Sequence, residues 1–128
     1  MRCYDAAKVA SAGGYQVNGD AEKIETLVRL ASEMGADIIK ADPTDNPEDF
    51  HLVVETARVP VLVRGGGREN LKAVLMKSAA LMAQGAKGMV YGRNIYQHDN
   101  PKAVVNALMV LIHQGASGEE AWDIYNRG

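Results

Sequence analysis

Apolar residues recur every three or four positions in four long stretches of the chain, the spacing that places them on one face of an α-helix. The residues that start and stop helices agree with this pattern. Asp20 and Asn46 stand where helix caps are expected, and Gly35 stands where the first helix should stop. Pro47 and Pro101 occupy first helical positions. We therefore predict helices over residues 21–34, 47–57, 69–84 and 101–113, with a last amphipathic turn or two over 118–126.

Between these helices lie short apolar runs that are typical of buried strands and too short for helices. They cover residues 36–41, 60–64 and 87–91. Strict alternation of helices with continuously apolar strands indicates parallel βα units, whose strands are covered on both faces. The pattern therefore predicts an α/β fold, preceded by a loop-like segment over residues 1–19.

Length and composition restrict the class of protein. The 128 residues suit a single domain, 1–128, and fall well short of the roughly 250 residues of a complete (β/α)8 barrel. A formal net charge of -2 gives no reason to expect nucleic acid or a membrane surface as a partner. The first residues lack the apolar core of a signal peptide, and no apolar run approaches the ~20 residues of a membrane span. Cys3 is the single cysteine and cannot form an intrachain disulfide, which suits a reducing compartment. We therefore expect a cytoplasmic protein.

The carboxyl ends of parallel strands are where α/β proteins bind ligands, and Lys40 lies at the first of these ends. Apolar residues flank it on both sides, so we expect its ammonium group to be partly desolvated, which favours the free amine. A free amine attacks carbonyl groups to form a Schiff base. The residue pattern alone favours a plainer alternative, a lysine that extends into solvent or pairs with Asp42 or Asp45.

Glycines follow the other two predicted strands. Gly65, Gly66 and Gly67 come directly after the second strand and just before a helix, a geometry that suits phosphate binding by backbone amides. Gly92 and Arg93 follow the third strand, where the guanidinium adds a fork of donors. Two adjacent strand ends of this kind predict one shared phosphate site, with a flexible βα turn as the alternative at the glycine run.

The sequence resembles the class I aldolases of the archaeal-type fructose-bisphosphate aldolase family in three phrases: MGADIIKADPTDNPEDF, VPVLVRGGG and QGAKGMVYGRNIYQHDNPKAVVNALMVLIHQGAS. That family also includes the thiolase that processes phosphorylated autoinducer-2 and 2-amino-3,7-dideoxy-D-threo-hept-6-ulosonate synthase. The resemblance spans residues 20–127. It implies a (β/α)8 barrel in which Lys40, on the sixth strand, forms the Schiff base with the substrate carbonyl. It further implies that the substrate phosphate is bound by Gly65, Gly66, Gly67, Gly92 and Arg93.

The chain departs from the family's pattern in two respects. Strands one to five have no counterpart, so the family's acidic residue near strand one and its strand-five tyrosine, both used for proton transfer, are missing. Arg64 stands where the family usually has a small residue. We therefore consider two roles for Arg64, a charge-assisted contact with phosphate and an ion pair with a carboxylate.

We expect this chain to form about strands six to eight of a TIM barrel in a lyase that resembles fructose-bisphosphate aldolase and cleaves a phosphorylated ketose or related carbonyl compound. No metal or organic cofactor is expected, because the imine serves as the electron sink. Two alternatives are a fragment that binds sugar phosphate without turnover and a half-barrel that acts only as an assembly. Open sheet edges and an apolar inner face favour association, so we expect a homo-oligomer.

Overall fold

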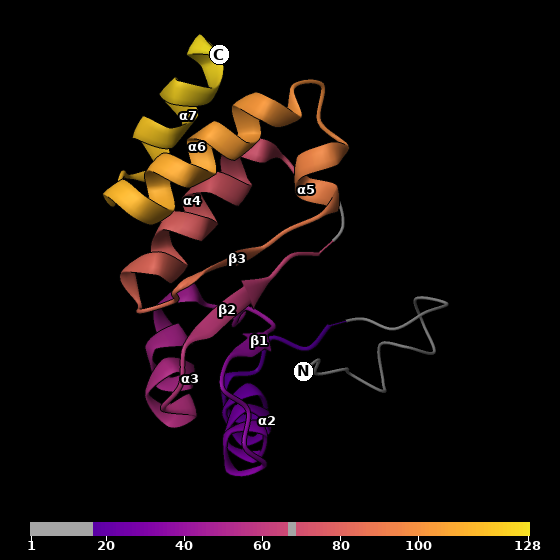
Figure 1. The fold of residues 1–128 in the computed structure, drawn as a ribbon, viewed down its shortest axis with the longest axis vertical. Helices are drawn as coiled ribbons and strands as arrows, with labels where there is room; N and C mark the ends of the chain where they lie inside the picture. Colours follow the sequence, from indigo (N-terminus) through magenta and orange to yellow (C-terminus); the bar gives the residue numbers. More distant parts are fainter. Residues whose placement is uncertain (1–16, 67–68) are drawn as a thin grey trace.

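The computed structural model describes residues 17–66 and 69–128, in which helices and strands alternate along the chain (Figure 1). The elements in chain order are α2 (Ala21–Glu33), β1 (Ile39–Ala41), the 3-10 turn η1 (Pro47–Asp49), α3 (Phe50–Ala57), β2 (Val61–Arg64), α4 (Leu71–Ala83), β3 (Gly88–Val90), α5 (Arg93–Tyr96), α6 (Pro101–Gln114) and α7 (Gly118–Arg127). This order confirms the predicted α/β alternation. The predicted loop-like segment lies outside the described residues except for residues 17–19, and Gly67 also lies outside them.

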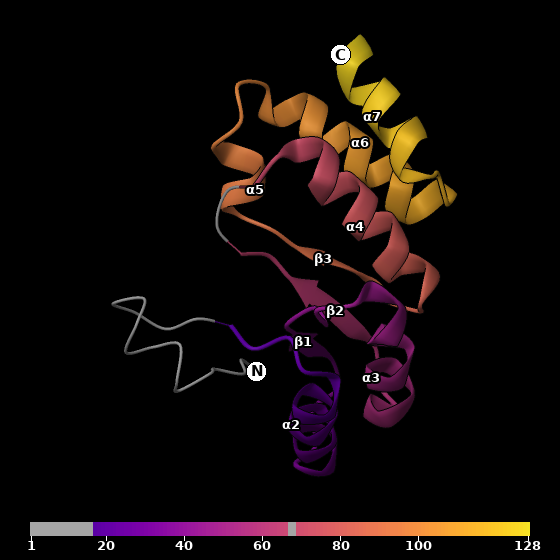
Figure 2. The ribbon, with the colours of Figure 1, turned by 180° about the vertical axis from the view of Figure 1, so that it is seen from behind.

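The three strands form one parallel sheet in the order β1-β2-β3, with α3 and α4 as the crossovers. Lys40 is paired in register with Leu62, and Leu62 with Gly88. Figures 1 and 2 show α2 and α3 at one end of the molecule and α4, α6 and α7 at the other, with the sheet between them. The strands are shorter than predicted, because a strand extends only where a neighbouring backbone completes its hydrogen-bond ladder.

Polar side chains cap the helices at the predicted positions. The side chain of Asp20 accepts a hydrogen bond from the amide of Lys23 at 3.1 Å, which starts α2. The second predicted helix begins differently, because Asn46 caps the 3-10 turn η1 and the α-helix starts only at Phe50. Such tighter turns are common at helix starts, where the first amides have no partner inside the helix.

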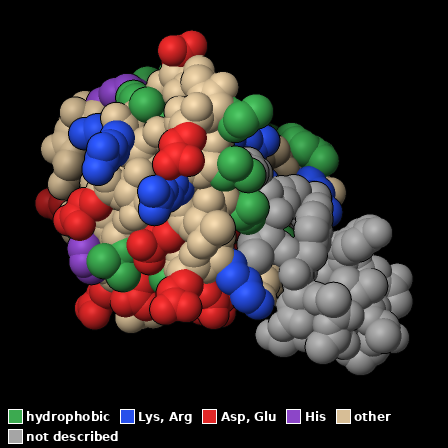
Figure 3. Space-filling view, turned by 90° about the horizontal axis from the view of Figure 1, so that it is seen from below, with side chains coloured by type: hydrophobic (Ala, Val, Ile, Leu, Met, Phe, Trp, Pro, Cys, Tyr) green, Lys and Arg blue, Asp and Glu red, His purple; other side chains and the backbone are tan. Residues whose placement is uncertain are grey.

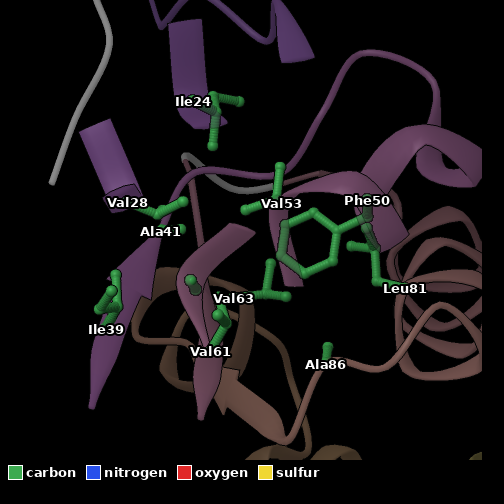
Figure 4. Packing of buried hydrophobic residues seen from close by; sticks show 11 residues of the cluster. Ile24, Val28, Ile39, Ala41, Phe50, Val53, Val61, Val63, Leu81 and Ala86 are labelled. Carbon is green, nitrogen blue, oxygen red and sulfur yellow. The ribbon is translucent and has the colours of Figure 1, made fainter. Parts of the chain in front are cut away.

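One core cluster lies between α2, α3 and the sheet (Figure 4). Phe50 and Val53 of α3 are fully buried against Val63 of β2 and Leu81 of α4. Full burial of a side chain such as Phe50 contributes about 1.5–3 kcal/mol. A second cluster joins α4, α6 and α7. Its buried members are Leu71, Leu75, Val104, Ala107, Leu108, Leu111 and Ala121.

The two faces of the sheet differ in their surroundings. Ile39, Val61 and Val63 point to the face that the helices cover, and all three are buried. Strand side chains alternate, so the residues between them point to the opposite face, which we call the open face. It carries Lys40, Leu62, Arg64 and Val90, of which Lys40 and Val90 are exposed. The prediction that both faces are covered is therefore wrong for the described residues.

Charged side chains of both signs share the surface that Figure 3 shows, which is the side of the molecule below α2 and α3 in Figure 1. Acidic side chains gather along one edge, and lysine and arginine side chains are interspersed among the others. The basic side chains of the described residues therefore form no continuous patch in this view. Among the described residues, no helix combines the length and the apolar character needed to cross a membrane.

Candidate functional site

Lys40 projects from β1 on the open face of the sheet and is exposed. The expectation that its apolar neighbours desolvate it is wrong. Ile39 and Ala41 are 3% and 1% exposed because they point to the helix-covered face, and alternation turns Lys40 away from them. Side chains that are consecutive along a strand lie on opposite faces of the sheet, so Ile39 and Ala41 do not cover Lys40. Lys40 is accessible to a ligand that approaches the open face.

The ends of β2 and β3 lie a short way beyond Lys40 along the strand direction. Lys40 is level with Leu62, and Gly65 follows Leu62 by three positions. At a rise of about 3.3 Å per residue, the start of the glycine run is therefore roughly 10 Å beyond the level of Lys40. A single substrate with a carbonyl group at one end and a phosphate at the other can span such a distance.

Arg64 forms an ion pair with Asp42, in which its Nε donates to Oδ1 of the carboxylate. The two side chains come from neighbouring strand ends and are 15% and 1% exposed, respectively. Because Arg64 alternates with buried Val63, the pair lies on the open face, beyond Lys40 toward the carboxyl ends of the strands. Of the two roles considered for Arg64, the structure contains the ion pair with a carboxylate.

The glycines after β2 differ from one another in their surroundings. The amide of Gly65 donates to the carbonyl of Val90 at 3.1 Å, so it continues the sheet ladder. A Cβ on Gly65 would lie 2.8 Å from Cδ1 of Tyr91, whereas a Cβ on Gly66 would meet only Oε1 of Glu69, at 3.8 Å. Gly65 is thus needed for packing and pairing, and Gly66 is the sterically open glycine of the two. Gly67, predicted to bind phosphate with them, lies outside the described residues.

The loop after β3 leads into the short helix α5. Gly92 precedes α5, and its carbonyl accepts from the amide of Ile95 at 2.8 Å. Arg93 is exposed, whereas Asn94 is 4% exposed and accepts from the amide of Glu69 at 3.0 Å. Asn94 therefore ties the loop after β3 to the loop after β2. Sequence reasoning assigned it no role, although a buried amide directly after a strand is a signal for such a tie.

Tyr91 belongs to the other side of the sheet. Its hydroxyl lies 2.8 Å from Oγ of Ser78, and that hydroxyl donates in turn to the carbonyl of Val74 at 2.7 Å. Since a serine hydroxyl has one proton to give, Tyr91 is the donor in their bond. Burial raises the pKa of Tyr91, and the charge of Glu69 raises it further. Tyr91 therefore holds the sheet against α4 and is directed away from the Lys40 face.

A cavity of about 190 Å³ opens between the three strand ends and α4. Its lining includes Thr44, Asp45, Gly65, Gly66, Lys77 and Asn94. Arg64 also lines it, so the cavity borders both the predicted phosphate loops and the ion pair of Arg64 with Asp42. In the described part of the chain, no group of three or more histidine, cysteine, aspartate or glutamate residues is placed to hold a metal ion.

Comparisons with known proteins agree on one family. The family model for the DeoC/LacD family aldolases matches residues 4–98. An uncharacterized aldolase of Saccharolobus solfataricus is 37% identical over 106 residues, which are 82% of this chain and 39% of that protein. The 2-amino-3,7-dideoxy-D-threo-hept-6-ulosonate synthase of Halobacterium salinarum is 35% identical over 102 residues, 80% of this chain and 38% of that protein.

A solved structure extends this similarity to the fold. It is of an archaeal fructose-1,6-bisphosphate aldolase with the catalytic lysine covalently bound to the carbinolamine intermediate of the substrate. It aligns with a TM-score of 0.71 at 31% identity, and covers 77% of this chain and 41% of that one. The chain therefore spans about two fifths of the length of the relatives it matches, and its three βα units correspond to part of their barrel.

Proposed function

The chain belongs to the DeoC/LacD family of aldolases, and on that basis we propose that it provides the Schiff-base and phosphate-binding part of a class I aldolase. The proposed substrate is a phosphorylated ketose or a related carbonyl compound. Lys40 is the proposed nucleophile, and Gly66, Gly67, Gly92 and Arg93 are the proposed phosphate ligands. Gly65 contributes by shaping the loop, because its amide is already paired with Val90.

The position of Lys40 carries this proposal. Lys40 is exposed on the open face, and its register partners are Leu62 and Gly88. The proposed ligands Gly66 and Gly92 each follow these partners by four positions, about 13 Å along the strands, which suits a carbonyl compound with a phosphate at its far end. The related fructose-1,6-bisphosphate aldolase, whose catalytic lysine is bound to a carbinolamine, supports the same chemistry for a lysine of this family.

The proposed reaction follows from imine chemistry. The neutral amine of Lys40 attacks the carbonyl carbon to give a carbinolamine, and loss of water gives a protonated imine. A base then removes the proton of the hydroxyl group on the second carbon from the imine carbon. The bond between the first and second carbons breaks, its electron pair forms the carbon–carbon double bond of the enamine, and the π electrons of the imine move to the nitrogen. An aldehyde leaves and an enamine remains. Protonation of the enamine carbon and hydrolysis then release the second carbonyl product and restore the lysine.

Reductive trapping tests the proposal. Sodium borohydride reduces an imine to a stable secondary amine. Incubation with dihydroxyacetone phosphate should therefore add the mass of one substrate less one oxygen atom at Lys40, because water leaves when the imine forms and reduction adds two hydrogens. Intact-mass and peptide mass spectrometry read this change. Lys40→Met should abolish the adduct. Lys87→Met is the matched control, since Lys87 is also exposed but precedes β3, at the opposite ends of the strands. An adduct of equal yield in Lys40→Met would remove Lys40 from the mechanism.

We further propose that turnover requires βα units beyond those described. The open face supports this, because Leu62 is only half-buried and Val90 is 36% exposed there, and an apolar sheet face of this kind is normally covered. The chain alone would then bind phosphorylated ligands without cleaving them, or would associate with itself through the open face. Light scattering measures the association, and an aldol-cleavage assay with and without a co-expressed amino-terminal part of the Saccharolobus relative measures the need for further units. Full cleavage activity by the monomeric chain would contradict this second proposal.

A further inference from the structure

We propose that Asp42 positions Arg64 to bind a carboxylate next to the carbonyl group that Lys40 attacks, so that the substrate carries a 2-oxo acid group as well as its phosphate. This inference rests on the proposed function and specifies the substrate class of the same site. It is carried by the ion pair of Asp42 and Arg64 on the open face of the sheet.

The ion pair of Asp42 and Arg64 lies between Lys40 and the proposed phosphate loops. Asp42 directly follows β1, two positions beyond Lys40, so the pair lies about 7 Å beyond Lys40 at 3.3 Å per residue. Arg64 comes from the adjacent strand and reaches across to Asp42 on the face that Lys40 occupies. The guanidinium is therefore held between Lys40 and the proposed phosphate loops. A substrate that extends from one to the other passes beside it.

The two partners of the ion pair differ in how accessible they are to a ligand. Asp42 is 1% exposed and Arg64 15%, so the part of the pair that a ligand can reach belongs to the arginine. The bond to Asp42 uses Nε of Arg64. A guanidinium has five N–H donors in a fixed fork, and its terminal nitrogens match the two oxygens of a carboxylate. Asp42 fixes the direction in which that fork points.

Charge favours a carboxylate over a second phosphate. The protonated imine formed at Lys40, the Asp42 carboxylate and the Arg64 guanidinium together carry a charge of about +1, which one carboxylate balances and a doubly charged phosphate exceeds. A stabilising role alone is a weaker explanation of the pair. Buried ion pairs contribute little to folding compared with apolar residues of the same size, because both charges lose their hydration.

The test compares two ketones that differ in the carboxylate. Pyruvate carries it next to the carbonyl and hydroxyacetone has none, and both can be trapped on Lys40 by borohydride. We expect Arg64→Met to raise the half-saturating pyruvate concentration by about tenfold or more, the size of a lost charge-assisted hydrogen bond. The value for hydroxyacetone should change by less than about twofold, because no such bond is lost. Asp42→Asn should weaken pyruvate trapping in the same direction, and Arg64→Lys should restore only part of it.

Other outcomes overturn the inference in distinguishable ways. An equal loss for pyruvate and hydroxyacetone would give the pair a general structural role. A loss confined to dihydroxyacetone phosphate would assign Arg64 to the phosphate. If the wild type traps neither ketone, the Schiff-base proposal fails, and calorimetric binding of lactate, which has the carboxylate but no carbonyl, then decides the role of Arg64. Lactate binding that is the same in wild type and Arg64→Met, with both folded by circular dichroism, would refute the inference.

Discussion

Replacing Gly65 with alanine separates the packing role of the glycine run from its proposed role in phosphate binding. The new methyl group would lie 2.8 Å from Cδ1 of Tyr91, and ordinary contact begins near 3.4 Å. The ring must therefore move by roughly 0.6 Å. It is not free to do so, because Tyr91 is half-buried against α4 and its hydroxyl bonds to Ser78 on that helix.

The expected magnitude follows from these contacts. Forcing one extra carbon into a packed region costs about 1–3 kcal/mol, and alanine returns about 0.4–1 kcal/mol by restricting the unfolded chain. We expect Gly65→Ala to lower the free energy of unfolding by about 1–2 kcal/mol. Gly66→Ala is the matched control. Its methyl group meets nothing closer than 3.8 Å, so it should be neutral or slightly stabilising.

Urea unfolding followed by circular dichroism measures the difference as a shift in midpoint at constant m-value. A double-mutant cycle with Tyr91→Leu then tests the cause, because a smaller side chain should remove most of the cost of Gly65→Ala. The reasoning is refuted if Gly65→Ala and Gly66→Ala unfold at the same urea concentration. In the trapping assay with dihydroxyacetone phosphate, Gly66→Ala should have the larger effect on half-saturation among folded molecules.

Three further predictions concern single contacts. Tyr91→Phe should lower the free energy of unfolding by about 1 kcal/mol at neutral pH, because one hydrogen bond is lost. Burial raises the pKa of Tyr91 above its usual 10.0, so the stability of the wild type is fully present below about pH 10 and falls as the pH rises through the higher pKa of the folded state. Urea titrations at pH 9 to 11 should therefore show a shallower fall in stability for Tyr91→Phe than for the wild type. Asn94→Ala leaves the amide of Glu69 without its partner and should cost about 1–3 kcal/mol in the same assay; an unchanged midpoint would mean that the two loops are held otherwise. Gly115→Ala places an alanine at the end of α6 where the backbone has a φ of +69°, which alanine adopts with strain. It should lower the free energy of unfolding in a thermal melt by about 1 kcal/mol through the backbone alone, because nothing lies within 4 Å of the added methyl group. A stability equal to that of the wild type would contradict this account.

The helices could be predicted closely because their signals are local. The caps Asp20 and Asn100 each bind an amide three residues on, so the sequence contains both partners within one turn. Strand lengths were harder. The predicted strand over 36–41 is observed only over Ile39–Ala41, since its extent depends on where β2 runs beside it.

The candidate site shows the same division. That Lys40, the glycine run and the Gly92-Arg93 pair follow successive strands is visible in the sequence, and parallel pairing then brings those strand ends to one edge. The exposure and the hydrogen-bond partners of these residues could not be predicted from the sequence. The exposure of Lys40 follows from strand alternation, and the use of the Gly65 amide follows from pairing with Val90.

The sequence by itself determined the order of helices and strands, the parallel α/β architecture, the family, and which residue types gather at the strand ends. Periodicity, capping and motif spacing are properties of neighbouring residues, so they need no knowledge of distant contacts. Only the tertiary structure decided that Arg64 pairs with Asp42, that Gly65 makes room for Tyr91, and that Asn94 joins two loops. These partners are 22 to 26 residues apart, and only the pairing of the strands and the packing of the sheet against α4 bring them together.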